Sequence, residues 1–134
     1  MEAEAARFIR EVPADESLSE TVNAAKALTW EYFREHAVLR LIDGRVVLVQ
    51  GGRYGINLQR SIVPTHEGRS SDVLFVMVED RLVQVRELVF HVHPKPTGPS
   101  DDDLLVMKLL NQEESRLFEI SGPRDGTLIR AGRK

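Results

Sequence analysis

The segment HVHPKPTGPSDDD, residues 91–103, gathers residue types that bind transition metals. His91 and His93 are two positions apart, so on a β-strand both imidazoles point to the same face. A helix that begins after Ser100 would carry Asp103 in its first turn, from where the carboxylate can reach back to the imidazoles. Two imidazoles and one carboxylate, with a fourth position left to water, are typical of a catalytic zinc site rather than a structural one. Zinc in such a site lowers the pKa of its water to about 7 and polarises a carbonyl.

The elements around this segment can be predicted from local patterns. ELVFHVH (87–93) is rich in β-branched and apolar residues and predicts a strand that ends at the two histidines. The prolines and glycine of 94–99 predict a stiff loop. Ser100 has the character of an N-cap, and the three aspartates that follow it favour the positive end of a helix dipole. We expect this helix to end near Asn111 or Gln112.

The rest of the chain predicts a mixed α+β domain. Ser17 and Glu20 have capping-box spacing, and apolar residues recur at helical intervals from about 18 to 34, so a helix is expected there. Asp43-Gly44 between two β-rich runs predicts a hairpin of 37–42 and 45–50. The other predicted segments are a short helix or loose arm (1–16), a third strand or extended edge (54–58), a loop (61–70), a strand or short helix (73–78) and a closing hairpin (116–120 and 127–130). This order predicts an N-terminal arm at 1–16 and a domain over 17–134 with an antiparallel or mixed sheet.

Composition narrows the function classes. The chain has 134 residues and a net charge of −3, without a block of basic residues that would indicate nucleic-acid binding. No apolar run approaches the roughly 18 residues of a membrane span. Cysteine is absent, so a metal site must use nitrogen and oxygen ligands. The start Met-Glu-Ala-Glu lacks the positive charge of a signal peptide. We therefore expect a soluble, cytoplasmic protein that binds neither nucleic acid nor membrane; the pattern leaves its oligomeric state open.

The residues after the predicted strand resemble a known family. His-x-His-Pro followed by Pro-Ser-x-x-Asp is similar to the signature of the JAMM (JAB/MPN) zinc metalloproteases. The matching residues are His91, His93, Pro94, Pro99, Ser100 and Asp103. The resemblance implies a JAB/MPN-like, cytidine-deaminase-like fold, in which helices flank a central mixed sheet. It also implies zinc bound by His91, His93 and Asp103, with Ser100 helping to stabilise the oxyanion.

The spacing departs from the family pattern by one residue. The family places ten residues between the second histidine and the aspartate, whereas nine separate His93 from Asp103. Anchoring on Pro-Ser-x-x-Asp puts the missing residue in the loop, where single deletions are easily absorbed. Asp102 is the fallback ligand, although it would then be misplaced relative to Ser100.

The family also requires an upstream glutamate as general base. Many members carry it in a Glu-x-x-Gly-type segment, but the closest stretch here, LVQGGRYG, has Gln50, which cannot take a proton. REHAVLRLIDGRVVLVQGG (34–52) resembles the RadC-like branch instead, and on this register Glu35 is the candidate base. Glu67 is a rival base. A glutamate at a helix end is otherwise an ordinary solvated residue.

These residues predict a zinc-dependent peptidase or isopeptidase that hydrolyses a peptide or ubiquitin-like isopeptide bond in a protein substrate. Ser100 and Asp103 also fit a capping box, and both interpretations can hold together because a cap would pre-orient the ligand. The alternative function is a catalytically inactive JAB/MPN-like scaffold, with Gln50 as the relic of a missing base. A secreted-effector use of the same fold is a third hypothesis.

Overall fold

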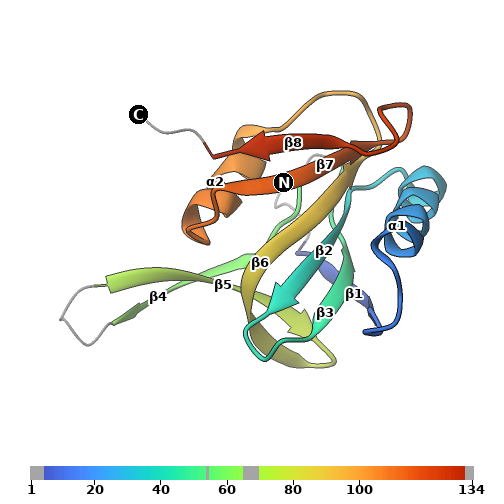
Figure 1. The fold of residues 1–134 in the computed structure, drawn as a ribbon. Coiled ribbons are helices and arrows are strands. Elements are labelled where there is room, and N and C mark those ends of the chain that lie inside the picture. The colour runs from blue at the N-terminus through green and yellow to red at the C-terminus, as the bar shows by residue number, and fades with distance from the viewer. Residues whose placement is uncertain (1–4, 54, 65–69, 132–134) are drawn as a thin grey trace.

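The computed structural model describes residues 5–53, 55–64 and 70–131, which form eight strands and two helices (Figure 1). In chain order the elements are β1 (Arg7–Glu11), α1 (Leu18–Tyr32), β2 (His36–Leu41), β3 (Val46–Gln50), β4 (Gln59–Pro64), β5 (Ser70–Val78), β6 (Arg81–His93), α2 (Asp101–Leu109), β7 (Glu114–Glu119) and β8 (Thr127–Arg130).

The strands form one mixed sheet that curls back on itself. Their order is β4-β5-β1-β3-β2-β6-β7-β8, and β5 also pairs with β6. Because β5 therefore pairs with both β1 and β6, the strands β1, β3, β2, β6 and β5 close into a ring. The first residues of β6 pair with β5, and its last four, Phe90–His93, pair in parallel with β7. The long strand β6 thus joins the ring to the outer strands and carries the two histidines at its end.

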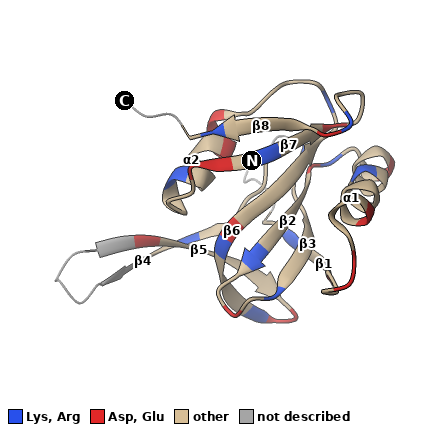
Figure 2. Ribbon diagram, viewed as in Figure 1, with Lys and Arg blue, Asp and Glu red and all other residues tan. Residues whose placement is uncertain are grey.

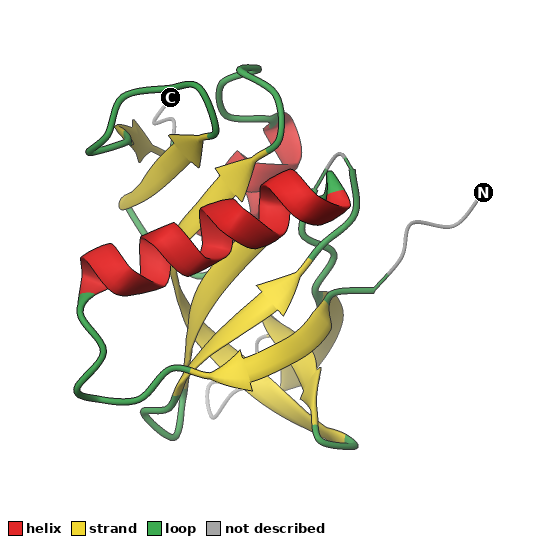
Figure 3. Ribbon diagram, turned by 90° about the vertical axis from the view of Figure 1, so that its right-hand side faces the viewer, coloured by secondary structure: helices red, strands yellow, loops and turns green. Residues whose placement is uncertain are grey.

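The two helices cover opposite faces of the strands β2 and β6 (Figure 3). On one face, Val22 and Ala25 of α1 pack with Val38, Phe90 and Phe118. On the other face, Met107 of α2 belongs to the larger core, which also contains apolar residues of β2, β3, β5 and β7. Alternation along each strand sends neighbouring side chains to different cores. The site residues must therefore lie on the face that α2 covers if they are to meet Asp103.

Most of the predicted elements are confirmed. Helix α1 begins at Leu18 after a complete capping box between Ser17 and Glu20. The hairpin of β2 and β3 around Asp43-Gly44 is present in the expected antiparallel register. Residues 73–78 belong to a strand, and the closing pair β7 and β8 is antiparallel as predicted.

Three predictions near the edges of elements are wrong. The expected arm or short helix at 1–16 contains β1, which is stabilised by pairing with β3 rather than by its own short apolar pattern. Of the loop expected at 61–70, residues 61–64 belong to β4 and Ser70 begins β5, while residues 65–69 lie outside the described residues. The strand β4 is an edge strand, where serine and proline are tolerated. The strand or extended edge expected at 54–58 is not a strand over 55–58, since β4 begins only at Gln59.

Helix α2 ends earlier than predicted, at Leu109. Asn111 adopts a left-handed conformation with φ 55°. The N–H of Gln112 then donates to the carbonyl of Met107, and that of Asn111 donates to the carbonyl of Lys108. This is the hydrogen-bond pattern of a Schellman motif, which ends the helix two residues before Asn111.

Charges of both signs are interspersed over the helices and strands (Figure 2). Helix α2 illustrates the arrangement, with aspartates in its first turn and Lys108 in its last, as the helix dipole favours. Neither described helix is long and apolar enough to cross a membrane.

Candidate metal centre

The pairing of β2 with β6 brings Glu35 to the histidines. These strands are antiparallel, with His36 opposite Val92 and Ala37 opposite His91. Continuing the register by one residue places Glu35, which directly precedes β2, opposite His93. Since alternate residues share a face, Glu35, His91 and His93 point to the same side of the sheet, and His36 points to the other. More than 50 positions separate Glu35 from the histidines in sequence, but the pairing of β2 with β6 makes them neighbours in space.

Helix α2 brings the carboxylate from the opposite direction. Ser100 is the N-cap, and its hydroxyl oxygen accepts a hydrogen bond from the Asp103 N–H at 3.1 Å. In return the Ser100 N–H donates to Asp103 Oδ2 at 2.9 Å. This capping box fixes the Asp103 side chain so that it turns back toward the strand end. Asp103 can therefore be a capping residue and a metal ligand at once. The nine residues between His93 and Asp103 are enough to bring the carboxylate to the histidines.

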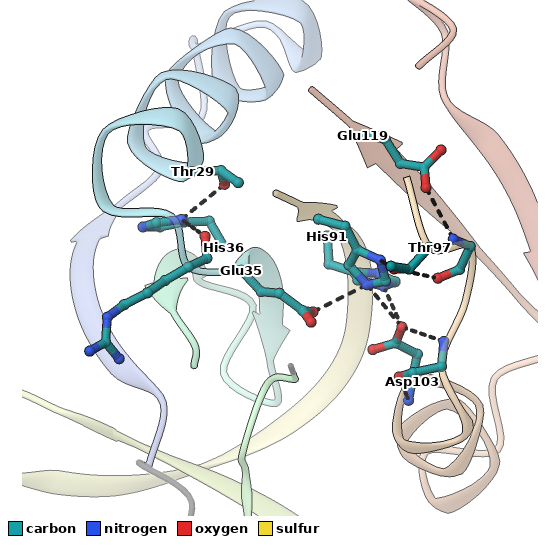
Figure 4. A network of polar contacts seen from close by, with 11 residues as sticks. Thr29, Glu35, His36, His91, Thr97, Asp103 and Glu119 are labelled. Atoms are coloured by element: carbon teal, nitrogen blue, oxygen red, sulfur yellow. Dashed lines mark hydrogen bonds and ion pairs between the residues drawn. The ribbon is translucent and has the colours of Figure 1, made fainter. Parts of the chain in front are cut away.

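The four side chains converge at one point between β2, β6 and α2 (Figure 4). Asp103 Oδ2 lies 3.0 Å from His91 Nε2 and 3.0 Å from His93 Nε2. Glu35 Oε1 lies 3.2 Å from His93 Nε2. One ligand atom from each of the four residues falls within 4.8 Å of all the others, and all four residues are buried.

Several atoms at this point have no hydrogen-bond partner among the described residues. Glu35 Oε1 and both ring nitrogens of His91 are buried without one, although His91 Nε2 lies close to Asp103. Burying polar atoms in this way is costly unless something else satisfies them. A cation held by the lone pairs of the two imidazoles and the Asp103 carboxylate would satisfy His91 Nε2. Zinc bonds of about 2.0–2.2 Å allow ligand atoms roughly 3–4 Å apart to share one ion, so the donor set fits zinc.

The loop after β6 supports the second histidine from behind. His93 Nδ1 lies 3.2 Å from Thr97 Oγ1, whose hydroxyl is placed to donate to the Gly98 carbonyl at 3.5 Å. The hydroxyl can then accept from His93 Nδ1–H, which leaves the Nε2 lone pair facing the cluster. Glu119 at the end of β7 accepts from the Gly98 N–H at 3.1 Å and fixes this loop (Figure 4).

Backbone hydrogen bonds from the loop after β3 hold Glu35. The Glu35 N–H donates to the Gly52 carbonyl at 2.9 Å, and the Gly51 N–H donates to the Glu35 carbonyl at 2.7 Å. A Cβ at position 51 would lie 2.5 Å from Ile56 Cδ1 and 2.6 Å from the Gly55 carbonyl oxygen. Only glycine fits there without a backbone shift. The Gly-Gly pair at the hairpin end therefore also positions Glu35.

Burial and the neighbouring charges set the protonation of the cluster. Burial lowers the pKa of His93, but the hydrogen bond with Asp103 and the nearby carboxylates of Asp103 and Glu35 outweigh it and raise that pKa to about 9. Burial acts to raise the pKa of Asp103, yet the nearby imidazole of His91 and the hydrogen bonds of His93 and the Ser100 N–H hold it well below its usual range. In the metal-free protein at neutral pH, a proton on His93 lies where a metal cation would otherwise bind.

A pocket of about 310 Å³ opens beside the cluster. The Glu35, His93 and Ser100 side chains reach it from the site, so a molecule in the pocket would meet all three. Ser100 uses its oxygen as acceptor for the cap, and no acceptor for its hydroxyl proton occurs among the described residues. That hydroxyl can donate to a group in the pocket. The remaining lining comes from the end of α1, the loop after β3 and the loop after β6.

His36 is a buried histidine that the sequence interpretation passed over. Its Nδ1 lies 3.0 Å from the Arg34 carbonyl and 3.0 Å from Thr29 Oγ1. Because a carbonyl only accepts, Nδ1 carries the proton, and Nε2 accepts from the Gln50 amide at 3.3 Å. Burial lowers the pKa of His36, although the Arg34 carbonyl acts in the opposite direction. Neighbouring residues of a strand point to opposite faces, so the position of His36 next to Glu35 predicts that His36 faces α1.

The other sequence candidates lie away from the cluster or outside the described residues. Gln50 faces His36 on the α1 side, where its amide donates to His36 Nε2. Asp102, the fallback ligand, is exposed and lies near Gly55. Glu67 lies outside the described residues. The group that the structure brings together is Glu35, His91, His93 and Asp103, with Ser100 at its edge.

Comparisons of the chain with protein-family models, with curated proteins and with solved structures found no match. The resemblance to the JAMM family stays a prediction from the sequence of residues 91–103.

Proposed function

We propose that this protein is a zinc-dependent peptidase or isopeptidase of the JAMM type. The observation that carries the proposal is the meeting of Glu35 with His91, His93 and Asp103. Three of these are the ligands that the resemblance implies, and the fourth is the base that it implies. The scaffold alternative depended on the lack of a glutamate near the ligands, and the position of Glu35 favours the hydrolase instead.

In this proposal His91, His93 and Asp103 hold the metal. Zinc bound there would acidify water and polarise the scissile carbonyl. Glu35, 3.2 Å from His93, accepts the proton of the attacking water and passes it to the leaving amine. The carbon–oxygen bond forms, the carbon–nitrogen bond breaks, and the products are a carboxylate and an amine. After the carbon–oxygen bond forms and before the carbon–nitrogen bond breaks, the Ser100 hydroxyl donates a hydrogen bond to the oxyanion.

The test of this function is the Glu35→Gln variant. Glutamine has nearly the shape of glutamate but cannot take a proton, so zinc should stay bound while hydrolysis falls by about 10² to 10⁴. Zinc content is measured in parallel with the hydrolysis of quenched-fluorescent peptides and of peptides joined through a lysine isopeptide bond. Glu87→Gln is the matched control, because Glu87 is a half-buried carboxylate paired with Arg40. Full activity in Glu35→Gln would refute the assigned mechanism, and zinc-loaded wild type without hydrolysis would favour the scaffold.

A further inference from the structure

Two cationic side chains line the pocket beside the group of Glu35, His91, His93 and Asp103. Arg53 comes from the loop after β3, and Lys95 comes from the loop after β6. Among the described residues, Glu35 is the one carboxylate residue that lines the pocket with them. The two cations belong to different loops, and the tertiary fold brings both to the lining of this pocket.

Neither cation forms an ion pair with a carboxylate among the described residues. Arg53 has no ion pair or hydrogen bond among the described residues, and Lys95 has no ion pair there either. The Lys95 ammonium lies over the Phe33 ring, 5.7 Å from its centroid. This contact holds the amine at the pocket wall while leaving its charge available. Arg53 by contrast offers a planar fork, which suits a carboxylate in a bidentate arrangement.

A carboxylate in the pocket would need such cations. Glu35 and Asp103 already bring two carboxylates to the site. A second anion beside them would be repelled in the absence of positive charge. A neutral peptide in the same place could accept hydrogen bonds from Arg53 and Lys95 but would leave their charges without a counter-charge.

We propose that the substrate carries a carboxylate group close to the bond that is hydrolysed, and that Arg53 and Lys95 bind it. The inference rests on the proposed hydrolase function and specifies its substrate class. Two sources offer this chemistry: the free α-carboxylate of a C-terminal residue, and the side chain of an aspartate or glutamate beside the scissile bond. The first makes the protein a carboxypeptidase, and the second makes it an endopeptidase or isopeptidase with acidic specificity.

The direct test uses small ligands whose hydroxamate binds zinc. The zinc-loaded full chain is titrated with the monohydroxamates of succinic, glutaric and adipic acid, and with the same compounds carrying a carboxamide in place of the carboxylate. At the best chain length the carboxylate compound should bind about tenfold more tightly, as expected for a charge-assisted hydrogen bond. The difference should vanish in the Arg53→Gln/Lys95→Gln double variant. It should persist in Arg86→Gln, an exposed arginine of β6 that does not line this pocket.

Each outcome bears on the inference. Equal affinities at every chain length, or a difference that survives in the double variant, would overturn it while leaving the zinc site in place. If zinc is bound but neither compound series binds, the pocket does not open to the metal, and both the inference and the proposed function fail.

Peptides bound to the zinc-loaded Glu35→Gln variant identify the source of the carboxylate. One peptide has neutral residues and a free C-terminus, a second has the same residues and a C-terminal amide, and a third is amidated but ends in glutamate. Tighter binding of the first identifies the α-carboxylate, and tighter binding of the third identifies the acidic side chain. Equal binding of all three would contradict the inference.

Discussion

Removing the metal should make the stability of the protein depend on pH in a direction fixed by His93. In the metal-free cluster, Asp103 and Glu35 raise the pKa of His93 to about 9, against 6.5 for an ordinary histidine. Between these two values the folded state binds more protons than the unfolded state. Stability from this group is therefore fully present below pH 6.5 and is lost as the pH rises through 9.

The size of the effect follows from the shift. Each pH unit between the two pKa values is worth about 1.4 kcal/mol, so the free energy of unfolding should fall by roughly 3 kcal/mol from pH 6.5 to pH 9. His36 acts in a different window. Because burial lowers its pKa, its contribution is lost only as the pH falls below 6.5. Over the range from 6.5 to 9 the slope belongs to His93.

The assay is urea unfolding of the full chain in a chelator at pH 6.5, 7.5 and 9. Metal-free Asp103→Asn is the comparison. It removes the carboxylate that does most to raise the pKa of His93, so its free energy of unfolding should depend less on pH. Wild type that is loaded with zinc should also lose most of the slope, because the metal replaces the proton. Metal-free stability that stays constant or increases between pH 6.5 and 9 would refute this description of the cluster.

Two substitutions test how the site is positioned. Gly51→Ala should cost about 1–3 kcal/mol and lower hydrolysis, because a Cβ there would lie 2.6 Å from the Gly55 carbonyl oxygen. Gly52→Ala, where the nearest atom is 3.8 Å away, should be tolerated in thermal unfolding and turnover, and equal effects of the two would contradict the packing argument. Ser100→Ala should cost about 1 kcal/mol through the lost cap to Asp103. It should keep zinc yet lower turnover by about 10² or more, and an active variant would show that the hydroxyl serves only the cap.

Much of the fold can be predicted from local patterns, because those patterns coincide with local hydrogen bonds. The capping boxes at Ser17 and Ser100 and the Asp43-Gly44 hairpin are short-range features, and all three are present. Strands β1 and β4 could not be predicted in this way. They have few apolar residues, and pairing with β3 and β5 stabilises them.

The candidate site divides along the same line. His91, His93 and Asp103 lie within one continuous segment of strand, loop and helix. The two histidines share a face because they are two residues apart on the strand, and the N-cap turns Asp103 toward them. Glu35 could be proposed only through a family resemblance, since nothing local distinguishes it from a solvated glutamate. Its place depends on the antiparallel register of β2 with β6. Arg53 and Lys95 carry no sequence signal at all, because the pocket that joins them exists only in the folded chain.

The most direct test of the central claim is the zinc content of the purified full chain, measured by mass spectrometry after dialysis against metal-free buffer. We expect about one equivalent of zinc in the wild type and in Glu35→Gln. His91→Ala should contain almost none, because two remaining ligands cannot hold zinc tightly. Circular dichroism of the three proteins checks that the variants are folded. Full zinc retention in folded His91→Ala would contradict the assignment of the metal to His91, His93 and Asp103.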